Sequence, residues 1–247
     1  MEIATIAGLN FSGTASRAAD AGIDADGLAD LAVRALCDEA ELTPKPGLVD
    51  CRGRAAHDDM DVALLVNSAF SLHPAFAAMA RAARNQEPSA ELQAELAEIG
   101  REGEREMLRA TRGVNTHRGA IWTLGLLVSS AAMGAGTVDE WCRRAATLAR
   151  LHDFDSGGAT SHGLHVRRRF GAAGARGEAE NGFPHIVRHG LPALRRTRAQ
   201  GGSEVHARLD ALLAIMAELD DSCLLYRGGR EGLHTAKQGA RRVLSAG

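Results

Sequence analysis

The chain is short of aromatic residues, cysteines and long apolar runs, and each shortage narrows the class of protein. Aromatic side chains make up 4% of its 247 residues. Because aromatics are enriched in strands, their scarcity beside abundant alanine, leucine and arginine favours helices over sheets. The four cysteines lie far apart with no CxxC pair, which argues against a zinc site and against a disulfide framework. We see no secretory signal peptide and no stretch of about 18 apolar residues, so we expect a cytoplasmic protein without a membrane span.

The overall charge is also small. A formal net charge of -2 gives no reason to expect a nucleic acid or an acidic membrane as partner. The basic residues are nevertheless clustered locally, so the protein could still bind a small polyanion. With 45% hydrophobic residues, the chain has enough apolar material to bury a real core.

Helical periodicity covers most of the chain after a weakly patterned N-terminal segment, residues 1–25. We expect helices over about 26–42, 62–84, 90–111, 117–133, 137–152, 183–198, 203–219 and 230–244. Residues 171–182 are rich in glycine and charge and are expected to form a loop. No convincing strand pattern occurs. The sequence therefore predicts an all-α protein, a single compact multi-helix domain over residues 26–247 with glycine-rich, charged active-site loops.

The polar turn at residues 111–119 lies between two expected helices and carries most of the chemistry. Gly113 suits the left-handed residue that closes a helix, and Asn115 or Thr116 suits the N-cap of the next helix. His117 and Arg118 would lie in its first turn, where cations are unfavourable unless an anion binds between them. A phosphate is the simplest such anion; the alternative is an ordinary helix hairpin.

Two earlier loops combine charge with restricted backbone. Lys45 lies between Pro44 and Pro46, which limits where its ammonium can go and suits a fixed phosphate contact; a solvated lysine in a rigid turn fits these residues equally well. The second loop, residues 57–61, holds three carboxylates and one histidine. Its oxygens suit Mg²⁺ bound together with substrate phosphates, although an acidic helix N-terminus is the alternative.

Two later loops repeat the combination of glycine, arginine and carboxylate. Glycines flank Arg176, so the backbone can approach a ligand and the guanidinium can grip phosphate oxygens. Glu178 is a candidate general base or metal ligand, or else a partner for Arg176. Arg227 precedes two glycines in the segment 220–229, where Cys223 is expected to be a packing thiol.

Taken together, these loops predict a site for a metal-bound polyphosphate. No P-loop and no dinucleotide-binding glycine motif occurs. The residues alone therefore indicate a helical enzyme that acts on a nucleotide or polyphosphate.

The same loops resemble the triphosphoribosyl-dephospho-coenzyme A synthase family. The matching pieces are Thr43-Pro44-Lys45-Pro46-Gly47-Leu48-Val49-Asp50, His57-Asp58-Asp59-Met60-Asp61, Thr111-Arg112-Gly113-Val114-Asn115-Thr116-His117-Arg118-Gly119, Gly174-Ala175-Arg176-Gly177-Glu178-Ala179, Gly182-Phe183-Pro184 and Arg227-Gly228-Gly229. They occur in the family's order and span nearly the whole chain. Arg118 stands where lysine is more usual, and Asp221-Ser222-Cys223 looks more like the malonate decarboxylase branch than the citrate lyase branch.

The resemblance implies a transferase. ATP and 3′-dephospho-coenzyme A would give 2′-(5″-triphosphoribosyl)-3′-dephospho-coenzyme A and free adenine, with Mg²⁺ accompanying ATP. A holo-acyl-carrier-protein synthase would use the product to load the carrier protein of malonate decarboxylase or citrate lyase. A homodimer is compatible with alanine-rich helices.

The resemblance also implies residue roles. The phosphate and substrate contacts are assigned to Lys45, Asn115, Thr116, Arg118, Arg176 and Arg227. The carboxylates Asp58, Asp59 and Asp61 are candidates for holding Mg²⁺ or for stabilising an oxocarbenium-like transition state. Glu39, Asp59 or Glu178 could be the general base, and His57 or His117 could protonate adenine or contact phosphate.

Two other functions use similar residues. A Mg²⁺-dependent N-glycohydrolase of nucleotide or ADP-ribosyl substrates would use water as the acceptor. A nucleotide-binding helical module would bind a polyphosphate without turnover.

Overall fold

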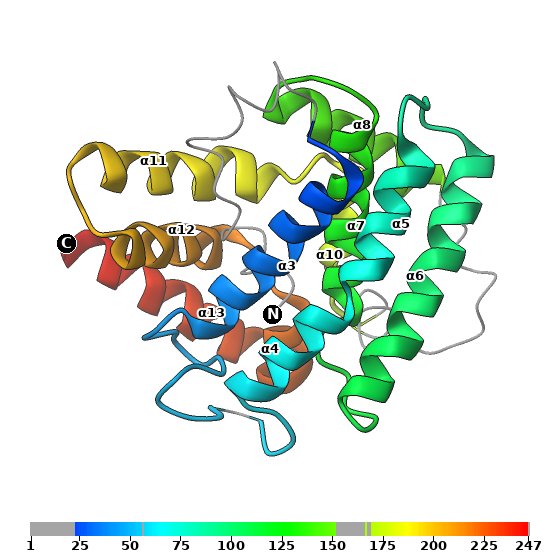
Figure 1. Cartoon of the computed structure of the whole chain (residues 1–247). Helices are drawn as coiled ribbons and strands as arrows, with labels where there is room; N and C mark the ends of the chain where they lie inside the picture. Colours follow the sequence, from blue (N-terminus) through cyan, green and yellow to red (C-terminus); the bar gives the residue numbers. More distant parts are fainter. Residues whose placement is uncertain (1–22, 56, 152–165, 167–168, 247) are drawn as a thin grey trace. The chain divides into compact units, whose positions relative to one another are not determined.

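Every regular element in the computed structural model is helical over the residues that it describes, which are 23–55, 57–151, 166 and 169–246. Within these residues the only pairing of strand type is an isolated bridge between Asp50 and Gly53. The all-α prediction is therefore confirmed (Figure 1). Most of the N-terminal segment 1–25 lies outside the described residues.

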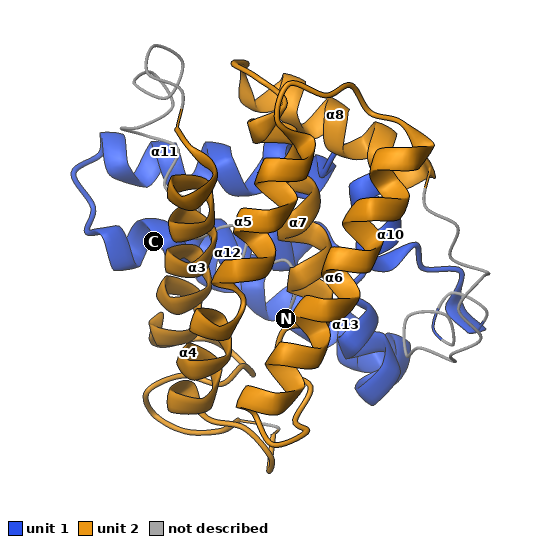
Figure 2. Ribbon diagram, turned by 45° about the vertical axis from the view of Figure 1, so that its right-hand side comes forward, with its two compact units in different colours: residues 1, 153–247 blue, residues 2–152 orange. Residues whose placement is uncertain are grey.

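The chain divides into two compact units (Figure 2). The first along the chain, drawn orange and labelled unit 2 in Figure 2, comprises residues 2–152. The second, drawn blue and labelled unit 1, comprises residues 153–247 together with Met1. The sequence had predicted one domain over residues 26–247, and no pattern of composition or linker marks the boundary found at residue 152.

Helix α3 (Ala25–Glu41) opens the first unit. Asp24 caps it, since its carboxylate accepts a hydrogen bond from the Gly27 amide at 2.8 Å. One face of small and branched apolar residues is buried, including Leu36. The helix ends just before Thr43 and Pro44, because a proline ring disfavours helical backbone at the preceding residue.

The continuous helix expected over residues 62–84 is wrong in one respect: it is broken at Leu72. Helix α4 (Val62–Ser71) ends there, and helix α5 (His73–Ala83) begins with Pro74 in its first turn. Pro74 has no backbone N–H, so it cannot continue the hydrogen bonding of α4 but fits the start of a new helix.

The same segment bears on the membrane expectation. Val62–Ala83, 22 residues, is long and apolar enough to cross a membrane by length and composition, although no such stretch was expected. Core helices meet this criterion too, and 44% of its most apolar window is buried inside the protein. The break at Leu72 and this burial show two packed helices.

Helix α5 packs on α3, on α6 (Ala90–Ala110) and on α7 (Arg118–Ala132), and α8 (Val138–Leu151) packs on α7. Two glycines permit this close packing. A Cβ atom on Gly103 of α6 would lie 2.9 Å from Ala75 Cβ, and one on Gly125 of α7 would lie 2.6 Å from Met79 Sδ. Glycine at these positions lets α5 come close to both neighbours.

The second unit contains α10 (Gly174–Glu180), the π-helical turn η2 (Ile186–Gly190), α11 (Leu191–Ala199), α12 (Glu204–Glu218) and α13 (Ser222–Ala246). Helix α12 packs on η2, α11 and α13. Helix α13 changes direction at Gly229, whose φ of 61° and ψ of -161° are not helical.

Two loop expectations in the second unit are wrong. Residues 171–182 contain α10, because positive-φ glycines bound a run of helix-compatible residues and Arg176 pairs with Glu180 one turn along. Segment 220–229 is mostly the start of α13, where the Asp221 carboxylate accepts a hydrogen bond from the Leu224 amide at 2.8 Å.

Candidate active site

A buried ion pair joins the end of α3 to the loop that follows it. The Lys45 ammonium donates to Glu39 Oε1 at 2.8 Å and to the Glu39 carbonyl at 2.5 Å. Lys45 is only 2% exposed, and Glu39 is buried as well. Two desolvated charges are costly unless they are paired and hydrogen-bonded, so this pair is a specific feature and not a solvated lysine in a turn.

Asp50 holds the backbone of the same loop. Its carboxylate accepts hydrogen bonds from the Lys45 amide and the Arg52 amide, each at 2.8 Å, and from Arg52 Nε at 2.9 Å. The Arg52 side chain, together with these amides, lowers the pKa of Asp50 to about 2. Asp50 therefore fixes the loop that carries Lys45.

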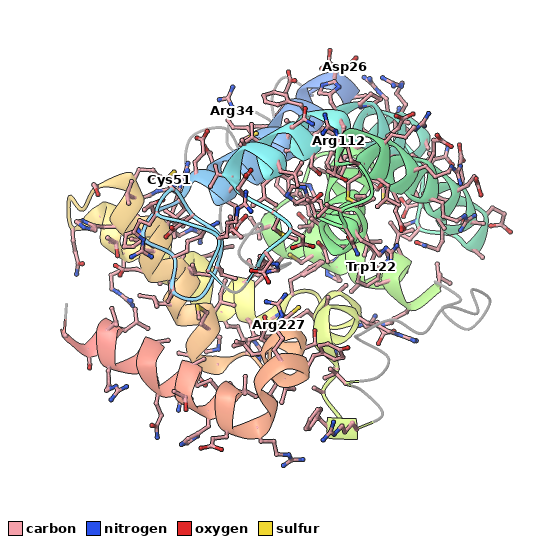
Figure 3. The ribbon with its side chains drawn as sticks, turned by 90° about the horizontal axis from the view of Figure 1, so that it is seen from below. Asp26, Arg34, Cys51, Arg112, Trp122 and Arg227 are labelled. Atoms are coloured by element: carbon pink, nitrogen blue, oxygen red, sulfur yellow. The ribbon has the colours of Figure 1, made fainter. Side chains whose placement is uncertain are left out.

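The turn between α6 and α7, where Figure 3 labels Arg112, closes α6 one residue earlier than expected, because Arg112 follows the C-cap Thr111 and is the first left-handed residue, with a φ of 55°. Gly113 has a φ of 91° and its amide donates to the Leu108 carbonyl at 2.8 Å. The expected N-cap is wrong by one or two residues, because His117 occupies that position without a side-chain cap bond. Asn115 instead accepts a hydrogen bond from the Arg118 amide at 3.3 Å.

His117 is 5% exposed and belongs to a buried hydroxyl network. Its Nδ1 lies 2.8 Å from Ser68 Oγ, and Ser68 Oγ lies 2.6 Å from Thr116 Oγ1. The other ring nitrogen, Nε2, is buried and has no hydrogen-bond partner among the described residues. Burial, and next the charge of Lys45, lower the pKa of His117 to about 4, so the ring is neutral near pH 7.

The structure thus brings several of the expected site residues into one part of the first unit. Glu39 and Lys45 are in contact, Thr116 and His117 share a hydrogen-bond network, and the charge of Lys45 acts on His117. Arg118 is half-exposed and forms an ion pair with Glu104.

The acidic loop before α4, residues 57–61, makes hydrogen bonds and ion pairs with residues close to it in the sequence. Asp61 is the N-cap of α4, accepting from the Leu64 amide at 2.9 Å, and it pairs with Arg54 at 3.2 Å. His57 lies 3.7 Å from Asp59. No group of three or more His, Cys, Asp or Glu side chains placed to hold a metal occurs among the described residues. The Mg²⁺ role of Asp58, Asp59 and Asp61 stays a prediction.

In the second unit Arg176 Nε donates to Glu180 at 2.6 Å. Glu178 is buried and contacts His185, with Oε1 2.5 Å from Nδ1 and Oε2 accepting from the His185 amide at 3.3 Å. The His185 ring stacks on His189 of η2 with centroids 5.9 Å apart. Arg227, labelled in Figure 3, lies in α13 ahead of its bend.

Comparison with known proteins identifies the family of this chain. Residues 25–247 match the family described as ATP:dephospho-CoA triphosphoribosyl transferase (CitG). The chain belongs to this family. The resemblance of its loop motifs to triphosphoribosyl-dephospho-coenzyme A synthases is thereby confirmed.

Individual members of the transferase family agree closely. The chain is 56% identical over 227 residues to an Azotobacter vinelandii protein named probable 2-(5″-triphosphoribosyl)-3′-dephosphocoenzyme-A synthase, covering 90% of this chain and 78% of that protein. A Pseudomonas aeruginosa protein of the same name is 54% identical over 237 residues, covering 94% and 81%. No solved structure matches the chain.

The sequence reading of this transferase missed two residues that contact expected site residues. Ser68 lies within an apolar helix that offers no polar pattern, and only its contacts with Thr116 and His117 reveal it. His185 directly follows the Gly182-Phe183-Pro184 run. A polar residue next to a matched motif was the available signal for His185.

Proposed function

We propose that this enzyme transfers the 5-triphosphoribosyl group of ATP to the 2′-hydroxyl of 3′-dephospho-coenzyme A and releases adenine. The bond from the ribose C1 to adenine breaks, the bond from C1 to the acceptor oxygen forms, and the hydroxyl proton is passed on, in net terms, to adenine. The membership of residues 25–247 in the transferase family supports this reaction.

The observation that carries the site assignment is the buried group of Glu39, Lys45 and His117. Buried charged and unpartnered polar groups are rare unless they serve a function. Lys45 and His117 lie in the two segments with the most specific motifs, and Glu39 lies at the end of α3. We assign Lys45, Asn115, Thr116 and Arg118 of this unit to the nucleotide, with Arg118 leaving Glu104 to do so.

For the second unit we assign Arg176 and Arg227 to phosphate groups and Glu178 to deprotonation of the acceptor hydroxyl. Glu39 is the weaker choice of base, since its carboxylate is neutralised by Lys45. The contact of Glu178 with His185 leaves it beside a group that can exchange protons. Glu178→Gln should lower kcat in the adenine-release assay by about 100-fold or more, and a normal kcat would remove Glu178 from the role.

We propose that Mg²⁺ binds mainly through the phosphates of ATP. One carboxylate oxygen of Asp61 is held by the α4 amide and the other by Arg54, which leaves Asp58 and Asp59 as the oxygen donors of this loop. This fits the tendency of Mg²⁺ to combine one or two carboxylates with substrate phosphates. A metal chelator should abolish adenine release, and added Mg²⁺ should restore it.

The deciding experiment follows adenine by chromatography, from ATP and Mg²⁺, with and without 3′-dephospho-coenzyme A. Adenine that appears only with the acceptor, beside a product heavier by one triphosphoribosyl unit, supports the transferase. Adenine without the acceptor would favour a glycohydrolase, and no turnover in either tube would favour a binding module.

We further propose that the product serves malonate decarboxylase in the cytoplasm, after a holo-acyl-carrier-protein synthase attaches it. The segment Asp221-Ser222-Cys223 is the observation in favour of this branch. Deleting the gene should abolish malonate decarboxylation and leave citrate cleavage intact; the reverse result would assign the other branch. The homodimer stays a prediction for sedimentation measurements.

A further inference from the structure

We propose that Ser68 is a positioning residue that holds His117 in the tautomer with hydrogen on Nε2, so that this buried N–H donates to an acceptor atom of the bound nucleotide. The proposal rests on the proposed function, and it adds a residue and a direction of hydrogen bonding to it. Ser68 is 0% exposed and lies on α4, far in sequence from the turn that it contacts.

The hydroxyl network has two possible directions. If His117 Nδ1 carried the hydrogen, it would donate to Ser68, and Ser68 would donate to Thr116. The Thr116 hydroxyl hydrogen would then have no acceptor among its described contacts, or the Ser68 hydrogen would have none if Thr116 donated to Ser68 instead. In either case the Nε2 lone pair would also be buried without a donor. Two groups would be unsatisfied.

The opposite direction leaves fewer groups unsatisfied. Thr116 donates to Ser68, and Ser68 donates to Nδ1, so both hydroxyl hydrogens and the Nδ1 lone pair are used. Only the Nε2–H of His117 then lacks a partner. Each buried unsatisfied polar group costs about 1–3 kcal/mol, so the second direction is favoured, and with it the Nε2–H tautomer.

A buried N–H without an acceptor is a site for a ligand atom with a lone pair. The neutral ring keeps the hydrogen while polarising its acceptor, as neutral histidines do in other active sites. A phosphate oxygen and an adenine ring nitrogen offer the same acceptor chemistry. His117 acts here by hydrogen bonding, which replaces the earlier hypothesis that it protonates adenine.

The tautomer can be measured directly. Two-dimensional ¹H–¹⁵N NMR of the ¹⁵N-labelled protein, with His117 assigned from its absence in His117→Gln, should show hydrogen on Nε2. In Ser68→Ala the same signals should shift toward a mixture of tautomers. A wild-type ring with hydrogen on Nδ1 would overturn the proposal, whatever the catalytic activity.

A pair of substitutions at His117 gives a functional test. The side-chain amide of His117→Gln can place an N–H near the position of Nε2, whereas that of His117→Asn reaches only the position of Nδ1. We expect kcat/KM of His117→Asn and of Ser68→Ala to fall about 10- to 100-fold, as for the loss of one buried hydrogen bond, and that of His117→Gln to fall less. Equal losses in the Gln and Asn variants, both with native circular dichroism, would contradict the proposal.

The acceptor is identified by measuring binding of the two halves of ATP separately. Calorimetry of Mg²⁺-tripolyphosphate and of adenine with wild type and His117→Asn should show weakened binding of one of them. Loss with tripolyphosphate assigns a phosphate oxygen, and loss with adenine assigns the base. Unchanged binding of both would overturn the proposal while leaving the transferase reaction itself intact.

Discussion

His117 is buried, and its Nε2 has no hydrogen-bond partner among the described residues. Its burial makes the stability of the protein depend on pH. Its pKa of about 4 in the folded protein lies below the ordinary value of 6.5. The unfolded chain therefore binds a proton first as the pH falls. The contribution of this neutral ring to stability is complete above about pH 6.5 and is lost as the pH falls toward 4.

We expect wild type to lose about 3 kcal/mol of unfolding free energy relative to His117→Gln between pH 7.5 and pH 4. Glutamine cannot titrate, so it provides the reference for all other groups. Urea unfolding at a series of pH values measures the difference. A constant gap between the two proteins would show that His117 does not titrate with a low pKa.

Whereas His117 is buried in its neutral form, Asp50 is stabilised by its hydrogen-bond partners in its charged form, the carboxylate. Its pKa of about 2 is below the ordinary 3.8, so its contribution is present above about pH 4 and is lost as the pH falls through 2. Asp50→Asn should lower the unfolding free energy by roughly 1–3 kcal/mol at pH 7, because two amides and Arg52 lose a charged acceptor. In urea unfolding this loss should shrink near pH 2, and a loss independent of pH would indicate packing instead.

Single residues also mark the limit of sequence reasoning. The position of Lys45 between two prolines predicted a restricted lysine, and the structure confirms it. Its partner Glu39 could be named only as a candidate base. That pairing depends on how the end of α3 meets the following loop, which no local pattern encodes.

At the scale of helices, the packing of α5 on α6 depends on a missing side chain. Gly103→Ala places a Cβ 2.9 Å from Ala75 Cβ, so the helices must move apart. We expect a loss of about 1–3 kcal/mol in urea unfolding. The rate of adenine release at 25 °C should stay close to that of wild type, because the protein remains folded at that temperature and Gly103 is not among the proposed site residues.

Gly239→Ala is the matched control, because this helical glycine of α13 has no atom within 4 Å of its would-be Cβ. The same substitution should stabilise the protein by about 0.4–1 kcal/mol here, since alanine restricts the unfolded chain. If the two variants behaved alike, the close approach of α5 and α6 would not be the cause.

Helix positions were predictable where the signals are local. The helix expected from about residue 90 begins there, with Ser89 as its cap, accepting from the Leu92 amide at 3.2 Å. The break at Leu72 was missed because apolar periodicity continues through Pro74. Helix α10 was missed because glycine content was read as a loop, although the glycines mark its ends.

For the molecule as a whole, substrate binding should raise the free energy of unfolding and with it the Tm. A ligand at 100 times its Kd adds about 2.7 kcal/mol, which corresponds to roughly 5–10 °C in Tm for a chain of this size. We expect Mg²⁺-ATP to raise the Tm in this way, and ATP with a chelator to raise it less. An unchanged Tm in both cases, with ATP well above the KM for adenine release, would contradict binding to the folded protein.

At the scale of the whole molecule, too, some features could be predicted from the sequence and others could not. The all-α class follows from periodicity and composition, and the family follows from ordered motifs that span the chain. The division near residue 152 does not follow from either, because it depends on contacts between distant residues. Evidence of that kind exists only in the folded chain.

The π-helical turn η2 determines how the residues before it are rotated about the helix axis relative to α11, which follows it. Its closing bond runs from the Leu191 amide to the Ile186 carbonyl, one residue further than in an α-helix. Deleting Val187 would regularise the turn and rotate the preceding backbone by about 100° relative to α11. His185 would leave its stack on His189, and the direction of the Glu178–His185 pair would change with no catalytic group removed. In η2, therefore, the number of residues matters more than their side chains, because one residue fewer would turn His185 away from His189.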